Sequence, residues 1–213
     1  MEIDEKNIKH YSFDFWNTIA FSNPKFKESR NKFISNLLSV NQIQINEAFF
    51  TIGQKYNLQQ EKDNITYTPE ELLNKVIAHF EPTQNCTPIF DEINYFFTQF
   101  PPLLNRNCND LILKIKKYNK TLSILSNTAF ISGELLKEFL IKEYGENTFS
   151  FFIFSDQVKI AKPNRQVFEL CFFETKKLFG NTINKSQIMH IGDNLVNDIK
   201  GGANFGFKTY LFS

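Results

Sequence analysis

From about residue 103 onward, the chain alternates short apolar segments with segments of helical periodicity, and this alternation limits the fold more than any other feature. A strand followed by a crossover helix pairs in parallel with the next strand, and the connection is right-handed. We therefore predict an α/β fold built on a parallel sheet. The predicted strands cover Thr121–Leu125, Phe151–Phe154, Ile188–Ile191 and Lys208–Phe212. The predicted helices cover Asp110–Lys117, Ser132–Tyr144, Asn164–Leu178 and Asn197–Asn204.

An aromatic-rich segment near the N-terminus, Tyr11–Phe15, predicts one further buried strand. Between this strand and the two prolines at positions 101 and 102, the pattern predicts helices and no strand. The clearest start signal is Thr68-Pro69-Glu70-Glu71, because Thr68 can cap a helix, Pro69 suits its first position and Glu71 completes a capping box. The other predicted helices of this segment begin near Phe26, cover Asn46–Tyr56 and begin at Thr87-Pro88.

A helical block inserted after the first strand of a parallel sheet suggests a second domain that covers the ligand-binding edge of the sheet. We predict a core domain formed by residues 1–20 and 101–213, and a helical cap domain formed by residues 21–100. Two proline-bearing linkers, Ala20–Pro24 and Pro101–Asn105, would join the two domains.

Composition excludes several classes of protein. Of the 213 residues, 42% are hydrophobic and 22% are charged, which matches globular usage and excludes wholesale disorder. The 24 basic and 23 acidic residues leave a net charge of +1, so no basic field exists to hold nucleic acid. No apolar run approaches the roughly 20 residues that cross a bilayer, and the charged segment Met1–Lys9 lacks the apolar core of a secretory signal.

The three cysteines, Cys86, Cys108 and Cys171, are widely spaced and form no CxxC pair, which indicates neither a zinc site nor a disulfide framework. We therefore expect a cytoplasmic protein with no membrane or nucleic-acid partner. The sequence carries no signal for the oligomeric state.

Polar residues follow each of four predicted strands. In an open parallel sheet the ligand crevice lies beyond the carboxyl ends of the strands, so these residues should meet there. Their carboxylates can hold Mg²⁺, and their hydroxyl and ammonium groups can neutralise a phosphate. The sequence therefore predicts a crevice that binds a divalent cation and a phosphate together. In chain order the residues are Asp14, Asn17, Thr18, Ser126, Asn127, Thr128, Ser155, Asp156, Lys159, Lys162, Asp193 and Asp198.

These segments resemble the four motifs of the haloacid dehalogenase (HAD) superfamily, in which Asp-x-Asp-x-Thr is followed by Ser/Thr, by Lys and by Gly-Asp-x-x-x-x-Asp. The matching segments are Phe13–Ile19, Leu125–Asn127, Lys162-Pro163 and Ile191–Asp198. The resemblance covers essentially the whole chain. It implies a Rossmann-like HAD core with an inserted, mostly helical cap of the C1 type, and a hydrolase that uses Mg²⁺.

The resemblance also implies a role for each matched residue. Asp14 would be the nucleophile that forms an aspartyl-phosphate, and it would also be a metal ligand. Asp193 and the backbone carbonyl of Trp16 would be the other metal ligands.

The remaining matched residues would act on the phosphoryl group. Lys162 would stabilise its charge, and Asp198 would orient Lys162 or a water molecule. Lys162 is favoured over Lys159 because the family's lysine commonly precedes a proline. The residues that would bind substrate or phosphate, or support the loop that does so, are Ser126, Asn127, Lys162, Thr18 and Trp16.

The chain departs from the family at position 16. Phosphatases of the family carry a second aspartate there, which protonates the leaving oxygen and then activates water. The indole of Trp16 offers only an N–H donor. Because loss of a general acid–base group usually costs about 10² to 10⁴ in rate, we expect slow hydrolysis of alkyl phosphates unless another group, such as His79, takes over.

Three explanations of Trp16 stay open. The first is a substrate whose leaving group needs no proton, as in 2-haloacid dehalogenases, which carry Tyr at this position but lack the metal carboxylate of Asp193. The second is phosphonate cleavage through a cap lysine, for which Trp16 is too large and no lysine stands out among Lys25, Lys27 and Lys32. The third is a module that binds phosphate and Mg²⁺ with little turnover. We expect a Mg²⁺-dependent phosphatase of a small phosphorylated metabolite, with weakened acid–base catalysis.

Overall fold

The structure is a computed structural model and describes residues 7–63, 65–80 and 87–212. Its central element is a five-stranded sheet with the strand order β5-β4-β1-β6-β7, in which all neighbouring strands are parallel. This arrangement confirms the predicted α/β fold. Phe13, the last residue of β1, lies opposite Ile124 of β4 and Ile191 of β6, so the three central strands end at one edge. The strands are β1 (His10–Phe13), β4 (Thr121–Ser126), β5 (Phe151–Phe154), β6 (Ile188–Gly192) and β7 (Lys208–Leu211).

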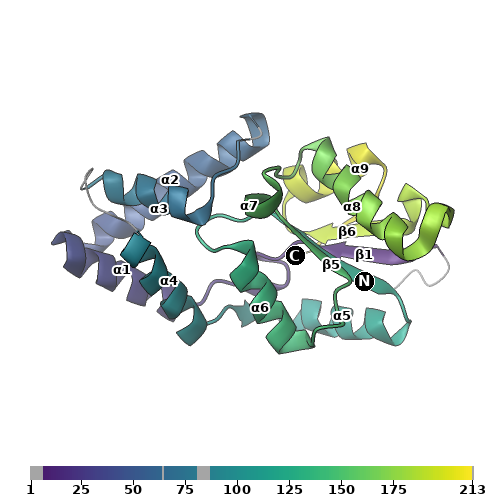
Figure 1. The fold of residues 1–213 in the computed structure, drawn as a ribbon, viewed down its shortest axis with the longest axis horizontal. Coiled ribbons are helices and arrows are strands. Elements are labelled where there is room, and N and C mark those ends of the chain that lie inside the picture. Colours follow the sequence, from purple (N-terminus) through teal and green to yellow (C-terminus); the bar gives the residue numbers. More distant parts are fainter. Residues whose placement is uncertain (1–6, 64, 81–86, 213) are drawn as a thin grey trace.

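Helices cover both faces of this sheet, with α8 and α9 on one side of the strands and α5 and α6 on the other (Figure 1). Successive strand residues point to opposite faces, and this alternation separates two hydrophobic clusters. Ile124 of β4 belongs to the cluster with α5 and α6, whereas its neighbour Leu125 belongs to the cluster with α8 and α9. The helices are α5 (Arg106–Lys117), α6 (Gly133–Tyr144), α7 (Ser155–Val158), α8 (Arg165–Phe179) and α9 (Gly201–Phe205). Short 3₁₀ turns cover Gly180–Thr182 and Lys185–Gln187.

The helices of the core differ from the prediction in three places, the first of which is that α5 begins at Arg106, four residues before the predicted start at Asp110. The segment predicted as one helix over Asn197–Asn204 is a π-helical segment, Leu195–Lys200, followed by α9. The single-turn helix α7 was not predicted, because four residues are too few to show a helical period.

Four helices within residues 24–99 follow β1 in the chain and gather at one end of the molecule (Figure 1). The capping box predicted at Thr68 is confirmed, since the Thr68 hydroxyl accepts from the Glu71 N–H at 3.2 Å and the Glu71 carboxylate accepts from the Thr68 N–H at 2.6 Å. The second helix is longer than the predicted Asn46–Tyr56, since it also includes residues 42–45 at its start and residues 57–63 at its end. The helices are α1 (Pro24–Leu38), α2 (Gln42–Asp63), α3 (Pro69–Ala78) and α4 (Thr87–Gln99).

Two short strands connect this helical block to the rest of the chain. β2 (Ala20–Phe21) and β3 (Leu103–Leu104) pair antiparallel, and Ala20 lies opposite Leu104. Both were missed in the sequence, since two residues carry no readable alternation. The chain therefore leaves the sheet region and returns to it along adjacent paths.

Among the described residues, no helix combines the length and the apolar character that crossing a bilayer requires. Cys108 and Cys171 are buried, free thiols. Cys86 lies outside the described residues.

Candidate active site

Asp14 is the first residue after β1 and lies at the carboxyl edge of the sheet. Its N–H donates to the carbonyl of Ile191 at 2.8 Å, which fixes its backbone to β6. Its carboxylate oxygen Oδ1 accepts from the Ser126 hydroxyl at 2.9 Å and from the Lys162 ammonium at 2.7 Å. Burial raises the pKa of Asp14 to about 7, because the nearby Lys162 offsets only part of the desolvation and Asp198 and Asp193 add negative charge.

Lys162 is almost fully buried and bridges two carboxylates. Its ammonium group donates to Asp14 Oδ1 at 2.7 Å and to Asp198 Oδ1 at 2.6 Å. Burial alone would lower the pKa of Lys162, but Asp14 and Asp198 outweigh this effect and raise it. Lys162 is therefore a fixed positive charge beside Asp14.

Asn127 holds the backbone of Lys162 at both of its polar groups. The Asn127 carbonyl Oδ1 accepts from the Lys162 N–H at 2.8 Å, and the Asn127 amide Nδ2 donates to the Lys162 carbonyl at 2.9 Å. Asn127 follows β4 directly, so these two bonds fix the position of Lys162 relative to the sheet. The side chain of Asn127 positions Lys162.

Asp198 lies close against the end of β6. A Cβ at Gly192 would come within 2.2 Å of the Asp198 carboxyl group, so only glycine at this position allows the approach. The carboxylate accepts from Lys162 and from His190 Nε2 at 3.0 Å through Oδ1, and from the Asn194 N–H at 3.0 Å through Oδ2. Burial favours protonation of Asp198, but Lys162 and His190 outweigh it and hold its pKa well below the usual range.

His190 continues this network into the interior of the sheet. It is fully buried, and burial lowers its pKa. A neutral imidazole that donates from Nε2 to Asp198 leaves Nδ1 to accept from the Ser12 hydroxyl at 3.1 Å. We infer this tautomer from the hydrogen-bond pattern.

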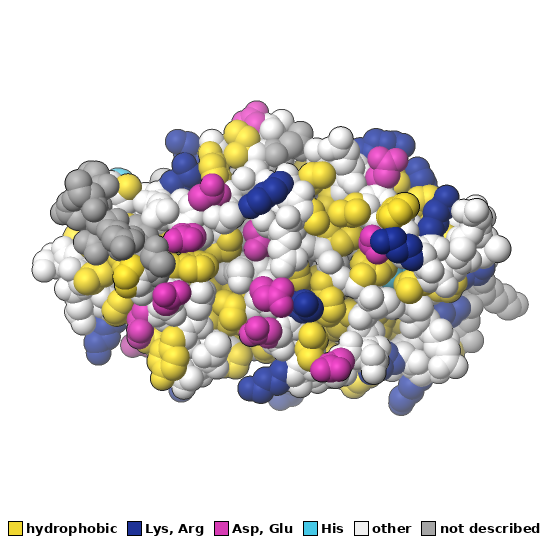
Figure 2. All heavy atoms as spheres, in the orientation of Figure 1, with side chains coloured by type: hydrophobic (Ala, Val, Ile, Leu, Met, Phe, Trp, Pro, Cys, Tyr) yellow, Lys and Arg dark blue, Asp and Glu magenta, His cyan; other side chains and the backbone are white. Residues whose placement is uncertain are grey.

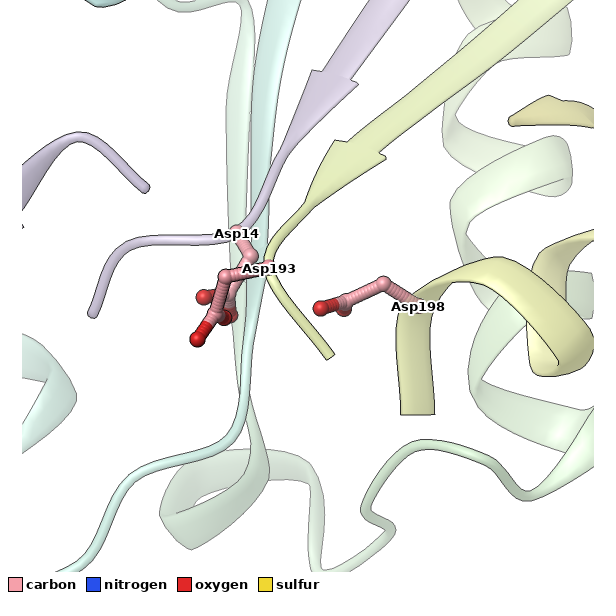
Figure 3. A group of neighbouring side chains, drawn as sticks. All are labelled: Asp14, Asp193 and Asp198. Carbon is pink, nitrogen blue, oxygen red and sulfur yellow. The ribbon is translucent and has the colours of Figure 1, made fainter. Parts of the chain in front are cut away.

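Three carboxylates converge at this edge of the sheet. Asp14, Asp193 and Asp198 each offer one oxygen, and these oxygens lie within 4.8 Å of one another. Figure 3 shows Asp14 and Asp193 side by side, with Asp198 pointing toward them from the helical segment after β6. Asp193 Oδ2 accepts from the Asn17 amide at 3.2 Å, and Asn17 adopts the left-handed backbone conformation with φ of 58°.

A cavity of about 340 Å³ opens above the carboxylates. One wall comes from the ends of the strands and the loops that follow them, and the opposite wall comes from α1 and α2. The strand-end wall includes Asp14, Trp16, Asn17, Asn127, Lys162, Asp193, Asn197 and Asp198. The helical wall includes Phe26, Lys27, Arg30, Asn57 and Gln60.

A family model for haloacid dehalogenase-like hydrolases matches residues 8–206. The chain belongs to the haloacid dehalogenase-like hydrolases. An uncharacterized hydrolase of Schizosaccharomyces pombe is 26% identical over 170 residues, which cover 77% of this chain and 70% of that protein.

Solved structures of HAD proteins share the fold. The HAD hydrolase YfnB of Bacillus subtilis, bound to magnesium, superposes with a TM-score of 0.72 at 18% identity, covering 97% of this chain and 89% of YfnB. A 2-haloacid dehalogenase of Pseudomonas syringae superposes with a TM-score of 0.65 at 17% identity, covering 96% of this chain and 86% of the dehalogenase. At these identities the likeness establishes the HAD fold and leaves the substrate open.

Most residues singled out in the sequence meet at this HAD site, and a few lie elsewhere. Ser126 contacts Asp14 directly but is not among the described residues that line the cavity. Thr18 is also outside that lining; it is fully buried, and its hydroxyl has no hydrogen-bond partner in the described part of the chain. Lys159 is exposed and does not line the cavity. His79 lies against Phe80 and lines a separate pocket.

Several residues of the HAD site were not identified as site residues from the sequence. Arg30, Asn57 and Gln60 reach the cavity from the helical block, and nothing in a helical pattern marks which of its polar residues do so. Asn197 precedes Asp198, and its buried side-chain oxygen Oδ1 has no partner among the described residues.

Asp156 lies in α7, directly after β5, and was not given a role from the sequence. It accepts from the Thr128 hydroxyl at 3.0 Å and from the Gly133 N–H at 3.0 Å. These bonds hold the loop after β4, which forms part of the cavity wall.

Proposed function

We propose that this HAD-like hydrolase is a Mg²⁺-dependent phosphatase that acts through an aspartyl-phosphate on Asp14. The observation that carries the proposal is the environment of Asp14. Its carboxylate lies beside a buried ammonium, a hydroxyl and a second carboxylate, at the floor of a cavity of about 340 Å³. A cavity of this size suits a small metabolite.

The side chains at the floor of the cavity fit a divalent cation. Oxygens of three carboxylates lie within 4.8 Å of one another, and the buried ammonium of Lys162 offsets only one of their charges. Both oxygens of Asp198 already accept hydrogen bonds, which leaves Asp14, Asp193 and the backbone carbonyl of Trp16 as the groups that would hold Mg²⁺. The unpartnered oxygen of Asn197 is a further buried acceptor in the same cavity wall. When bound, Mg²⁺ would neutralise the phosphate oxygens.

The chain's own residues then perform the transfer. A carboxylate oxygen of Asp14 attacks phosphorus, a new O–P bond forms, and the bond from phosphorus to the leaving oxygen breaks. Lys162 and Ser126 donate to the phosphoryl group as its charge redistributes. Asp198 and Asn127 keep Lys162 in place throughout. Water then attacks the aspartyl-phosphate and releases inorganic phosphate.

The protonation of the leaving oxygen is the step for which this site offers the least support. The acidic residues among the described lining residues are Asp14, Asp193 and Asp198, and each already has the role given above. Trp16 lines the cavity where the family's phosphatases carry their acid–base aspartate. The leaving oxygen must therefore take its proton from water, which favours substrates with good leaving groups.

We also propose that residues 21–100 form a cap domain over a core of residues 1–20 and 101–213. Two observations support these boundaries: the paired connections Ala20–Phe21 and Leu103–Leu104 lie side by side, and α1 and α2 form the wall opposite the carboxylates. The partner we propose is a small phosphorylated molecule, and neither nucleic acid nor a membrane. Acidic and basic side chains are interspersed on the face in Figure 2, which supports this choice. A cytoplasmic location is part of the same proposal.

The test is phosphate release from p-nitrophenyl phosphate with and without Mg²⁺, followed by a panel of phosphorylated metabolites and short-chain 2-haloacids. We expect Mg²⁺-dependent phosphate release that is lost in the Asp14→Asn variant. Halide release from haloacids without phosphatase activity would favour the dehalogenase alternative. That alternative is suggested by Trp16, which stands where the family's phosphatases carry an acid. Thermal stabilisation by Mg²⁺ and phosphate without any turnover would favour a binding module.

A further inference from the structure

Arg30, on α1, is a buried cation without a carboxylate partner. Only 6% of its surface is exposed, and it lines the cavity opposite the acidic cluster. Within the ranges that the structure describes, no carboxylate forms an ion pair with it. Charged side chains are rarely buried unless they are paired, because burial removes their hydration. The pKa of Arg30 is lowered by burial to about 9, which still leaves the guanidinium protonated at neutral pH.

The contacts of Arg30 occupy one edge and one face of its guanidinium. Nε and Nη2 donate to the Asn31 side-chain oxygen at 3.0 and 2.9 Å. The ring of Phe49 stacks on the guanidinium, with the central carbon 3.5 Å from the ring centroid, and Phe26 approaches to 5.8 Å. The other edge, which carries Nη1, has no hydrogen-bond partner in the described part of the chain. A planar pair of N–H donors is therefore free at the cavity.

The two walls of the cavity carry opposite charge. The strand-end wall holds the three carboxylates with Lys162, whereas the helical wall offers Lys27 and Arg30 and the amides of Asn57 and Gln60. No acidic residue of α1 or α2 is among the described lining residues. The helical wall thus suits an anionic group that lies away from the reacting phosphate.

We propose that Arg30 binds a carboxylate on the leaving-group part of the substrate, so that the substrate is a small phosphorylated carboxylic acid. A carboxylate is planar and matches the two free N–H donors of the guanidinium edge. The inference rests on the proposed function, because it places the phosphate at Asp14 and the carboxylate at Arg30. Asn31 and Phe49 hold the guanidinium in place before the substrate arrives.

The test uses ligands that the enzyme cannot hydrolyse at a phosphate ester. Binding of 3-phosphonopropionate is compared with that of propylphosphonate, in which a methyl group replaces the carboxylate, by calorimetry in Mg²⁺. We expect the wild-type protein to bind the carboxylated ligand about tenfold more tightly or better, as a charge-assisted bidentate contact provides. Ethane-1,2-diyl bisphosphonate tests whether the same edge prefers a second phosphonate.

Three variants assign the preference. Arg30→Gln should bind both phosphonates equally, with the weak affinity for propylphosphonate unchanged. Arg30→Lys keeps the charge and the apolar stem but loses the planar pair of N–H donors, so it should retain only part of the preference for 3-phosphonopropionate. If Arg30→Gln fails to fold, Arg30→Lys still tests the site. Lys32→Gln removes an exposed cation from the same helix outside the cavity lining and should keep the full preference.

The outcomes separate this inference from the proposed function. Equal binding of the two phosphonates by the wild-type protein, or tighter binding of the bisphosphonate than of 3-phosphonopropionate, would overturn the carboxylate site while leaving the phosphate site intact. A preference that survives in Arg30→Gln would also overturn it. Failure of both phosphonates to bind in Mg²⁺ would overturn the phosphate site at Asp14 and the Arg30 site together.

Discussion

Replacing Trp16 with aspartate should increase the hydrolysis of simple alkyl phosphates. In the proposed function, the three acids among the described lining residues are all engaged: Asp14 as the attacking group, Asp193 beside it, and Asp198 with Lys162 and His190. None is free to protonate a leaving oxygen. The full acid–base contribution, about 10² to 10⁴ in rate, is therefore missing from this site.

The structure also sets how much of that contribution a new carboxylate can restore. The backbone around position 16 is fixed, because the Asn17 N–H donates to the Ala20 carbonyl at 2.9 Å and Trp16 forms a β-bridge with Ala20. The new carboxylate would start from the same Cβ. The Trp16 indole packs edge-on against Phe15, with 4.9 Å between the ring centroids. The smaller aspartate leaves part of this space to water, which competes with the carboxylate. We therefore expect a gain of about tenfold or more, at the low end of the usual range.

The assay measures Mg²⁺-dependent phosphate release from ethyl phosphate and from p-nitrophenyl phosphate. Trp16→Asn is the matched control, because its side chain has the size of aspartate and no acid. The gain of Trp16→Asp over Trp16→Asn should be large for ethyl phosphate and small for p-nitrophenyl phosphate, whose leaving group departs without a proton. Equal rates of ethyl phosphate hydrolysis in well-folded Trp16→Asp and Trp16→Asn would mean that the carboxylate at position 16 does not protonate the leaving oxygen. They would indicate that another group supplies this proton.

Two further predictions concern the candidate site, and a third concerns His10, which is buried in β1. Asn127→Ala removes both side-chain contacts to the Lys162 backbone, so kcat for p-nitrophenyl phosphate should fall about 10- to 100-fold in steady-state kinetics. An unchanged kcat would mean that Lys162 keeps its position without the Asn127 side chain. Asp14→Asn should raise Tm at pH 8 without metal by about 2–4 °C or more and should remove any shift of Tm by Mg²⁺. Because burial raises the pKa of Asp14 to about 7, its ionisation destabilises the folded state progressively as the pH rises from about 4 to 7, and the full effect is present at pH 8; a lower Tm for the variant would contradict this. Burial lowers the pKa of His10 to about 3, so the unfolded state binds a proton at His10 more tightly than the folded state between about pH 6.5 and 3. The free energy of unfolding should therefore fall on acidification by up to about 1.4 kcal/mol per pH unit, and urea unfolding at several pH values should show a smaller dependence of this free energy on pH for His10→Gln.

The parallel sheet and the convergence of the strand-end residues were predictable because both depend on local sequence. Alternation of strand and helix, and a polar residue at the end of each strand, place Asp14, Ser126, Lys162 and Asp193 at one edge whatever the details of packing. The capping box at Thr68 is local in the same sense. In each case a few neighbouring residues determine the outcome.

The helical wall of the site was not predictable, because it depends on how distant elements pack. Arg30 reads as one more charged residue of an amphipathic helix, and only the docking of α1 and α2 over the sheet edge buries it at the cavity. The requirement for glycine at position 192 was not predictable either, because it arises from the close approach of Asp198 on the following turn. His79, an apolar-face histidine considered as a replacement acid, lies at a different pocket for the same reason.

In the proposed mechanism, Asp14 carries the phosphoryl group during turnover. The most direct measurement mixes the protein with Mg²⁺ and p-nitrophenyl phosphate, stops the reaction in acid within the first turnovers, and analyses the peptides by mass spectrometry. We expect one added phosphoryl group on the peptide that contains Asp14, and none in Asp14→Asn. Metal-dependent phosphate release with the phosphoryl group on another residue, or undiminished release by Asp14→Asn, would contradict it.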